Sequence, residues 1–474
     1  MPAERTRFAP APSGYLHIGN VRTALLNYIV AKKSGGEFIL RVEDTDARRA
    51  TKEATDAIES TLSRLGIPPD ESPSKGGKRA PYVQSQRLSL YHDAATRLMK
   101  EGRAYYCYCS DAELEEMRLT QRAAGKKPRY DNRCRNLTEK RKSRYESEGR
   151  KPAIRLALEP EKLSFDDLIH GTLTFDLADE GDPVLIRSNG APTYLMAASL
   201  DDGLMGITTV IRGEDLLPVT ARQIALIRFL GFSPPRYAHH GLLMGVGGKP
   251  LSKRHGDTSA LGWLERGVHP EALCVFIAAL GASWSEGVMP KSMEEVMSAL
   301  SMKNISASSV VFEPHSLVAF NKKFINHLPI ERAINEFAPF WGEALAGEKL
   351  DDEQLRLLAD LTRDSVENLN EVATFVKELL DDKPEFDKAR LDKLREEEGR
   401  RVIAALKKAV AEGARSETLI DRVKAITGLK GRGLFEPLRI ALTGKEEGAP
   451  LASYLNFLGL KRIERRINYI EGLL

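Results

Sequence analysis

Two short segments of this chain contain residue types suited to binding a polyphosphate. The first, His17-Ile18-Gly19-Asn20, directly precedes residues 21–31, whose apolar side chains recur at helical spacing. A helix N-terminus presents free backbone N–H groups and the positive end of the helix dipole, which favour phosphate. His17 can donate to a phosphate oxygen, and Gly19 allows a ligand to approach the backbone. A solvent-facing histidine in an ordinary loop is the alternative interpretation of so short a motif.

The second segment, residues 247–256, combines glycines with Lys249, Lys253 and Arg254. Cations on such a loop suit the charge that develops on pyrophosphate during phosphoryl or nucleotidyl transfer. The alternative is a solvated basic turn. The sequence contains no G-x-x-x-x-G-K-[ST] loop, so a P-loop ATPase has no support.

Three cysteines have the pattern of a metal site. Cys107-Tyr108-Cys109 offers two thiolates to one ion, and Cys134 offers a third. Three ordinary reduced thiols are the alternative. The fourth cysteine, Cys274, lies in an apolar helical segment and is interpreted as a core thiol.

The elements that must hold these residues follow from the hydrophobic pattern. Residues 5–10 predict a short buried strand and residues 11–14 a tight turn, so that residues 1–110 alternate strands and helices. Residues 111–185 interrupt this pattern with a basic stretch and strand-like pieces such as residues 153–158. The pattern then resumes, with strands predicted at 184–187 and 208–212. Beyond residue 330, helical spacing dominates, as in residues 352–359, 365–380 and 399–411.

Composition excludes several classes of protein. The 474 residues predict at least two domains, and the N-terminus lacks the apolar core of a signal peptide. No apolar run approaches the length of a membrane span. Four cysteines argue against a secreted disulfide framework and favour the cytoplasm. The net charge of only +3 means that any nucleic-acid surface must be a local basic patch.

Several ordered blocks together resemble the bacterial glutamyl-tRNA synthetases, which are class I aminoacyl-tRNA synthetases. The first segment and the basic loop resemble the HIGH and KMSKS motifs of that class. The resemblance runs from Arg7 to the C-terminus, with its matching blocks at residues 7–20, 38–46, 192–194, 201–202, 210–215, 251–256 and 437–444.

The resemblance implies an α/β fold: a Rossmann-type catalytic domain with an inserted acceptor-binding domain, followed by an all-α anticodon-binding region. The expected segments are 1–110 and 186–250 for the two catalytic halves, 111–185 for the insertion, 251–330 for a helical stem-contact domain with the KMSKS-like loop, and 331–474 for the anticodon-binding domain. Glutaminyl-tRNA synthetases share the N-terminal motifs but have β-barrel anticodon domains, so the helical last third favours the glutamyl group.

The resemblance also implies roles for individual residues. The expected catalytic residues are His17, Asn20 and Lys253. ATP, with Mg²⁺, is expected to contact these three residues and Pro12, Gly14, Gly19, Leu251, Ser252 and Arg254. Glutamate is expected to contact Arg7, Ala9, Glu43, Tyr194 and Arg212, with the arginines at its side chain and Glu43 at its ammonium group.

Zinc-containing members of the family have a similar cysteine block, in which the fourth ligand is a tyrosine at the position of Tyr130 or a histidine at that of Asn136. The expected zinc ligands are therefore Cys107, Cys109, Tyr130 and Cys134, and a metal-free branch stays open. The chain departs from the family's usual residues at Ala11, Leu195, Ala198 and Pro250, which leaves substrate affinity and choice open.

The expected activity is ATP-dependent ligation of glutamate to tRNA through a glutamyl-adenylate, with transfer to the terminal ribose 2′-hydroxyl. A glutaminyl-tRNA synthetase and a tRNA-binding paralogue with weak catalysis are the alternatives. The expected partners are L-glutamate and tRNA for glutamate, with tRNA for glutamine left open. We expect a cytoplasmic monomer that does not bind membranes.

Overall fold

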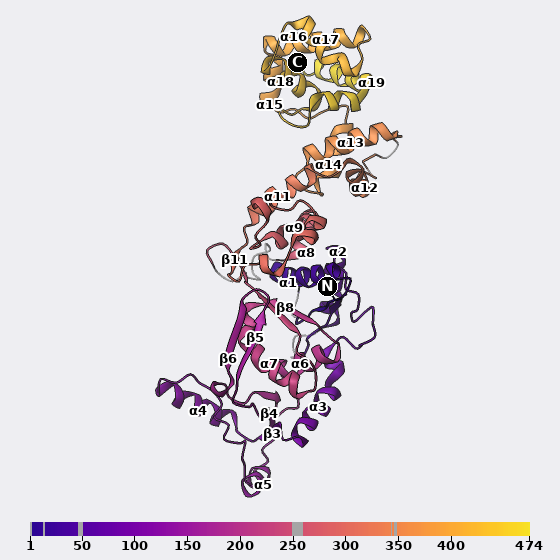
Figure 1. Cartoon of the computed structure of the whole chain (residues 1–474). Coiled ribbons are helices and arrows are strands. Elements are labelled where there is room, and N and C mark those ends of the chain that lie inside the picture. Colours follow the sequence, from indigo (N-terminus) through magenta and orange to yellow (C-terminus); the bar gives the residue numbers. More distant parts are fainter. Residues whose placement is uncertain (1, 13–14, 46–50, 249–258, 343, 346–347) are drawn as a thin grey trace. The chain divides into compact units, whose positions relative to one another are not determined.

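The computed structural model describes residues 2–12, 15–45, 51–248, 259–342, 344–345 and 348–474. The chain forms two compact units (Figure 1). The first contains Met1–Trp263 and Leu273–Pro314, and the second contains Leu264–Ala272 and His315–Leu474. Within the described ranges, no helix is long and apolar enough to cross a bilayer.

The first unit is built on a six-stranded sheet in the order β2-β1-β8-β9-β5-β6. The pairs β1–β2, β1–β8, β8–β9 and β5–β9 are parallel, and β6 pairs antiparallel with β5. The strands are β1 (Arg5–Phe8), β2 (Glu37–Leu40), β5 (Lys162–Asp167), β6 (Gly171–Asp176), β8 (Thr209–Gly213) and β9 (Arg236–His240). A mainly parallel sheet of this kind gathers its ligand-binding residues at the carboxyl ends of the strands.

Two smaller sheets and the remaining helices complete this part of the chain. One sheet has the order β3-β4-β7, from β3 (Ala104–Cys107), β4 (Ala153–Leu156) and β7 (Val184–Ile186), and the other pairs β10 (Leu243–Met244) with β11 (Val310–Val311). The helices are α1 (Ile18–Lys33), α2 (Lys52–Arg64), α3 (Leu88–Lys100), α4 (Asp111–Ala123), α5 (Glu139–Ser147), α6 (Tyr194–Leu204), α7 (Leu217–Phe229), α8 (Ala260–Glu265), α9 (Pro270–Ala279) and α10 (Met293–Ala299).

The predicted strands and the first helix are confirmed as β1, β4, β7, β8 and α1. Helix α1 is buried along most of its length because Val21, Leu25 and Ile29 are fully covered. The hairpin of β5 and β6 lies within residues 111–185, and its first strand pairs with β9 in the main sheet. The main sheet therefore includes strands from the segment that interrupts the α/β pattern.

The second unit is helical in its described residues, as the sequence predicts beyond residue 330. Its helices are α11 (Pro314–Asn326), α12 (Ile330–Trp341), α13 (Asp352–Ser365), α14 (Glu371–Leu380), α15 (Lys388–Arg395), α16 (Glu397–Ala411), α17 (Leu419–Thr427), α18 (Arg432–Thr443) and α19 (Leu451–Glu471). Their apolar faces meet in one large core that includes Phe337, Trp341, Leu406 and Leu438.

The helix predicted over residues 365–380 is wrong at its start. Helix α13 ends at Ser365 and α14 begins at Glu371. Between them, the Asn368 side chain accepts from the backbone N–H of Asn370 at 3.1 Å and donates to Glu371 at 2.6 Å. Asparagine side chains that bond the local backbone in this way compete with helical hydrogen bonds.

Candidate active site and metal centre

A cavity of about 450 Å³ lies at the carboxyl ends of the parallel strands. Its wall combines residues of β1 and β8 with the N-terminus of α1 and the start of α6. The residues predicted from the sequence that line it are Arg7, Ala9, His17, Gly19, Asn20, Glu43, Tyr194 and Arg212. The structure therefore brings together residues from four separate parts of the sequence around one space.

The α1 end of the cavity has the features of an anion site. His17 is the N-cap residue, and its Nδ1 accepts from the backbone N–H of Asn20 at 3.3 Å. A neutral ring with an accepting Nδ1 has its proton on Nε2, so the other ring nitrogen is a donor. The first turn contains no acidic residue that would offset the helix dipole. A Cβ on Gly19 would lie 3.0 Å from the His17 ring, so glycine here leaves room for that ring.

A chain of buried ion pairs holds two of the predicted glutamate-binding residues. Asp202 accepts from Arg7 at 3.1 Å and from Arg41 at 2.6 Å, and Arg41 pairs with Glu43 at 2.9 Å. Arg41 is completely buried, and Asp202 and Arg7 are each 3% exposed. Buried guanidinium groups require such partners, so Asp202 and Arg41 fix the positions of Arg7 and Glu43.

The two carboxylates of this chain have opposite pKa shifts. Burial opposes ionisation of Asp202, but the guanidinium groups of Arg7 and Arg41 hold its pKa below the ordinary value. Burial raises the pKa of Glu43 above its ordinary value, although Arg41 acts in the opposite direction. A cation brought into the cavity would thus lower the pKa of Glu43, because it would stabilise the ionised carboxylate.

Arg212, on strand β8 beside β1, is held by neutral groups. Its guanidinium donates to the Tyr194 hydroxyl at 3.1 Å, to Thr220 Oγ1 at 2.7 Å and to His239 Nε2 at 3.0 Å. Arg212 is 4% exposed. Within the described part of the chain, no carboxylate forms an ion pair with Arg212. A nearly buried cation without a carboxylate partner is a strong anion-binding group.

Among the remaining predicted ATP-site residues, only Pro12 lies in the part of the chain that the structure describes. Pro12 is buried and is not among the residues that line the cavity. Gly14, Pro250, Leu251, Ser252, Lys253 and Arg254 lie outside the described residues. Gly247 and Gly248, just before them, have φ angles of +82° and +71°, as a glycine turn requires.

Two of the departures from the family's usual residues belong to the core. Leu195 and Ala198, on α6, are 6% and 0% exposed and are not among the residues that line the cavity.

Sequence reasoning missed the second layer of the site, the residues that hold the lining side chains from behind: Arg41, Asp202, Thr220 and His239. Arg41 and Asp202 lie inside blocks that the resemblance already singled out, but nothing in the sequence shows which partner each one meets.

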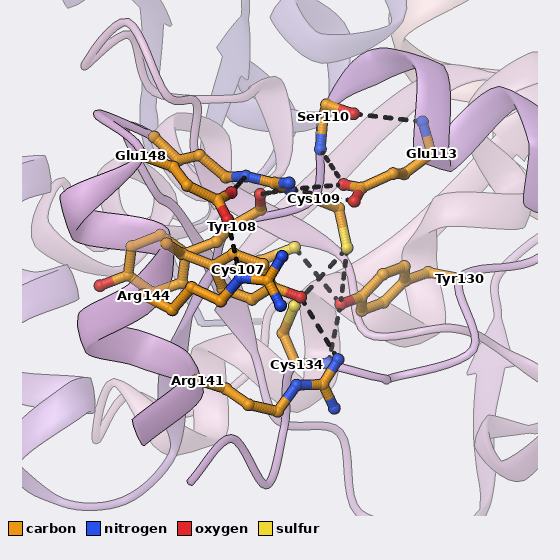
Figure 2. Close-up of polar contacts among 12 residues, drawn as sticks. Cys107, Tyr108, Cys109, Ser110, Glu113, Tyr130, Cys134, Arg141, Arg144 and Glu148 are labelled. Carbon is orange, nitrogen blue, oxygen red and sulfur yellow. Dashed lines mark hydrogen bonds and ion pairs between the residues drawn. The ribbon is translucent and has the colours of Figure 1, made fainter. Parts of the chain in front are cut away.

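The cysteine cluster forms a separate candidate metal centre (Figure 2). The sulfur atoms of Cys107, Cys109 and Cys134 lie within 4.8 Å of one another, and those of Cys109 and Cys134 are 3.5 Å apart. The Tyr130 hydroxyl lies 3.3 Å from the Cys107 sulfur and 3.8 Å from the Cys109 sulfur. The four predicted ligands therefore converge on one point.

This geometry fits zinc. Two sulfurs bound to one tetrahedral zinc at about 2.3 Å lie about 3.8 Å apart, close to the observed spacing. Arg155 lies over the Tyr130 ring, 3.6 Å from its centre, and its charge helps to lower the pKa of Cys107, whereas burial raises the pKa of Tyr130. Hydrogen bonds from Cys109 and Cys134 lower the pKa of Cys107.

The fourth cysteine, Cys274, is not part of this cluster and is fully buried in the core, as predicted.

Many basic residues of the 111–185 segment are engaged in surface ion pairs. Arg118 and Arg122 pair with Glu115, and Arg133 pairs with Asp131. In the second unit, Arg432 pairs with Glu436 at 2.5 Å, in the first turns of helix α18. These pairs reduce the charge available for binding a phosphate backbone at those positions.

Comparisons with known proteins agree with this architecture. Residues 4–327 match the family model for tRNA synthetases class I (E and Q), catalytic domain, and residues 331–470 match that for the anticodon binding domain. The chain is 38% identical over 469 residues to "Glutamate--tRNA ligase 2" of Syntrophus aciditrophicus, covering 98% of this chain and 96% of that protein. It is 37% identical over 475 residues to "Glutamate--tRNA ligase" of Carboxydothermus hydrogenoformans, covering 98% of both.

A solved structure is similar over the whole length. The crystal structure of a glutamate tRNA ligase from Elizabethkingia meningosepticum in complex with its amino acid matches with a TM-score of 0.83 and 30% identity, covering 100% of both chains. The glutamate-tRNA synthetase from Elizabethkingia anophelis matches with a TM-score of 0.78.

Proposed function

Because the chain belongs to the class I tRNA synthetases of the glutamate and glutamine type, we propose that it ligates glutamate to tRNA. In the first step, the glutamate α-carboxylate attacks the α-phosphorus of ATP, giving glutamyl-adenylate and pyrophosphate. In the second, the terminal ribose 2′-hydroxyl of tRNA attacks the activated carbonyl and releases AMP. Both steps depend on positioning and charge stabilisation rather than on a covalent enzyme nucleophile.

Arg212 is the single observation that most favours glutamate as the amino acid. Its guanidinium is nearly buried and meets only neutral partners in the described residues. A side-chain carboxylate would supply the missing negative charge, whereas the neutral amide of glutamine would leave the cation poorly paired. Arg7 also lines the cavity and would contribute, and Glu43 would accept from the substrate ammonium, whose positive charge would favour the ionised carboxylate against the burial that raises the Glu43 pKa.

We assign the phosphate side of the reaction to the N-terminus of α1. His17 would donate from Nε2 to a phosphate oxygen, and Asn20 would lie beside it. Lys253 would stabilise the leaving pyrophosphate, and Pro12, Gly14, Gly19, Leu251, Ser252 and Arg254 would complete the ATP contacts. Mg²⁺ would neutralise charge on the phosphates.

The same proposal extends to the other segments. Residues 111–185 would contact the tRNA acceptor end, residues 251–330 the stem, and residues 331–474 the anticodon. The match of residues 331–470 to the anticodon binding domain supports the last of these. We propose a monomer that acts in the cytoplasm.

We further propose one structural zinc held by Cys107, Cys109, Cys134 and Tyr130. Its support is the convergence of three sulfurs and one phenol at spacings that suit a tetrahedral ion. The ion would stabilise the segment around β3 and would take no part in the adenylation chemistry. Cys107 ends β3, so the ion would fix that strand to the loop containing Tyr130 and Cys134.

The decisive experiment measures ATP–pyrophosphate exchange with glutamate and with glutamine, each with and without tRNA. We expect exchange with glutamate, and charging of tRNA for glutamate. Charging of tRNA for glutamine, measured alongside, would define tRNA choice. Better exchange with glutamine would indicate a glutaminyl-tRNA synthetase. Absence of exchange with both amino acids, alongside retained tRNA binding, would indicate a tRNA-binding paralogue with weak catalysis.

A further inference from the structure

A buried hydrogen-bonded chain crosses three adjacent strands behind the cavity. Asp167 ends β5, His239 lies on β9, and Arg212 lies on β8. Arg212 and His239 are direct register partners in the parallel β8–β9 pair. His239 Nδ1 lies 2.6 Å from Asp167 Oδ2, and His239 Nε2 lies 3.0 Å from Arg212 Nε. The side chains of Asp167 and His239 are both 0% exposed.

The partners of His239 fix its tautomer. Arg212 Nε always has a hydrogen, so His239 Nε2 must accept, and its single ring proton lies on Nδ1, facing Asp167. Asp167 is itself held in place, because its Oδ1 accepts from the backbone N–H groups of Ile169 and His170 at 2.9 and 3.0 Å. The chain thus runs from a fixed carboxylate, through a neutral imidazole, to the guanidinium.

Thr220, on α7, closes the arrangement. Its hydroxyl accepts from Arg212 Nη2 at 2.7 Å and lies 3.1 Å from His239 Nε2. Together with Tyr194, these contacts engage all three nitrogens of the guanidinium. The plane of the Arg212 group is therefore set by Tyr194, which lines the cavity, and by His239 and Thr220, which do not.

We propose that His239 and Asp167 are positioning residues for substrate binding: they fix the guanidinium of Arg212 at the cavity wall and polarise it through the Nδ1–H tautomer of His239. This inference rests on the proposed function, since it takes Arg212 to bind the side-chain carboxylate of glutamate. Neither residue contacts the substrate. Their effect passes through Arg212 alone.

The alternative is that His239 merely fills space in the core. Its ring stacks on Tyr237 with centroids 6.0 Å apart, which any buried ring would do. Burial lowers the pKa of His239, although Asp167 acts against this. A neutral ring serves both interpretations, so a test must change the hydrogen-bond direction while keeping the volume.

Asp167→Asn makes that change. The amide oxygen can keep the bonds from Ile169 and His170, which turns the amide N–H groups toward His239 Nδ1. The imidazole must then accept at Nδ1 and hold its proton on Nε2, facing the Arg212 N–H. We expect the KM for glutamate to rise about 10- to 100-fold, as for loss of one hydrogen bond to a charged group, with the KM for ATP changed less than about threefold.

A pair of His239 variants tests the same point independently. In His239→Gln the side-chain oxygen can replace Nε2 as the acceptor for Arg212, whereas in His239→Asn the shorter amide can reach Asp167 but not Arg212. We expect the glutamine variant to bind glutamate several-fold more tightly than the asparagine variant. Asp166→Asn is the matched control, because the exposed Thr172 hydroxyl, at 2.7 Å, is the one hydrogen-bond partner of the Asp166 side chain within the described ranges.

The measurements are glutamate- and ATP-dependent exchange in the presence of tRNA, glutamate binding by calorimetry, and melting temperature, all on the full chain. Unchanged glutamate affinity in folded Asp167→Asn, or parallel losses of glutamate and ATP affinity, would overturn the inference. So would equal glutamate affinity in the two His239 variants, which decide the matter if Asp167→Asn does not fold. A wild-type protein without glutamate-dependent exchange would instead overturn the proposed function.

Discussion

Replacing Asp202 by asparagine removes the negative charge that two buried guanidinium groups share. Asp202 lies 3.1 Å from Arg7 and 2.6 Å from Arg41, and its side chain is only 3% exposed. Arg41 would keep Glu43 at 2.9 Å, but Arg7 would lose its only ion-pair partner among the described residues. Removing one member of a buried ion pair costs about 3–5 kcal/mol, because the other charge stays buried without compensation.

A matched control has the same chemistry at the surface. Asp70 lies 2.6 Å from Lys32 with side chains 35% and 28% exposed. Asparagine at position 70 can still accept from the backbone N–H of Phe38, which Asp70 binds at 2.7 Å. Exposed ion pairs contribute about 0–1 kcal/mol, so Asp70→Asn should lower the free energy of unfolding by no more than that.

Because the chain forms two compact units, a single melting curve would mix two transitions. Hydrogen exchange of peptides from β1, β8 and α1 reports the first unit alone. We expect Asp202→Asn to lower its free energy of opening by about 3–5 kcal/mol and to raise the KM for glutamate. If Asp202→Asn lowers that free energy no more than Asp70→Asn does, then the buried ion pairs do not hold the site.

Three further predictions use other parts of the molecule. Burial lowers the pKa of His240 to about 4. The stability that its neutral form contributes is therefore complete above about pH 6.5 and falls by about 3 kcal/mol as the pH drops to 4. His240→Asn should reduce this fall in the free energy of unfolding, measured by urea unfolding of the first unit. Elemental analysis should find about one zinc per chain, and Cys109→Ser should lower that content, whereas a fully active preparation without zinc would contradict the site. Lys253→Ala should slow adenylate formation by about 10²–10³-fold in a protein that melts normally, and normal exchange would refute its assigned role.

Local features of the site could be predicted from the sequence. The strand at 5–10, the helix after His17 and the convergence of Cys107, Cys109 and Cys134 all follow from patterns within short stretches. Such patterns report hydrophobic periodicity and ligand type directly. The fold class could be predicted for the same reason, because both the alternation of strands and helices and the helical last third follow from local hydrophobic patterns.

The second layer of the site could not be predicted in this way. Asp167 lies in a segment whose pattern suggested an insertion, yet β5 pairs with β9 and brings that carboxylate within 2.6 Å of His239. This contact depends on the strand order, in which β5 follows β9. Strand order is set by long-range packing, so the residue types alone do not show which acid meets which base.

The distribution of charge across the sheet edge explains why Arg212 rather than Arg7 should distinguish glutamate from glutamine. Arg7 and Arg41 are balanced within the protein by Asp202 and Glu43. Among the described residues, Arg212 is linked to a carboxylate through the neutral ring of His239 and forms no ion pair. A substrate carboxylate beside Arg212 would therefore pair with a guanidinium that forms no ion pair among the described residues. Beside Arg7, the same carboxylate would have to compete with Asp202. Discrimination against a neutral isostere is greatest where the protein's own buried charge would be left unpaired.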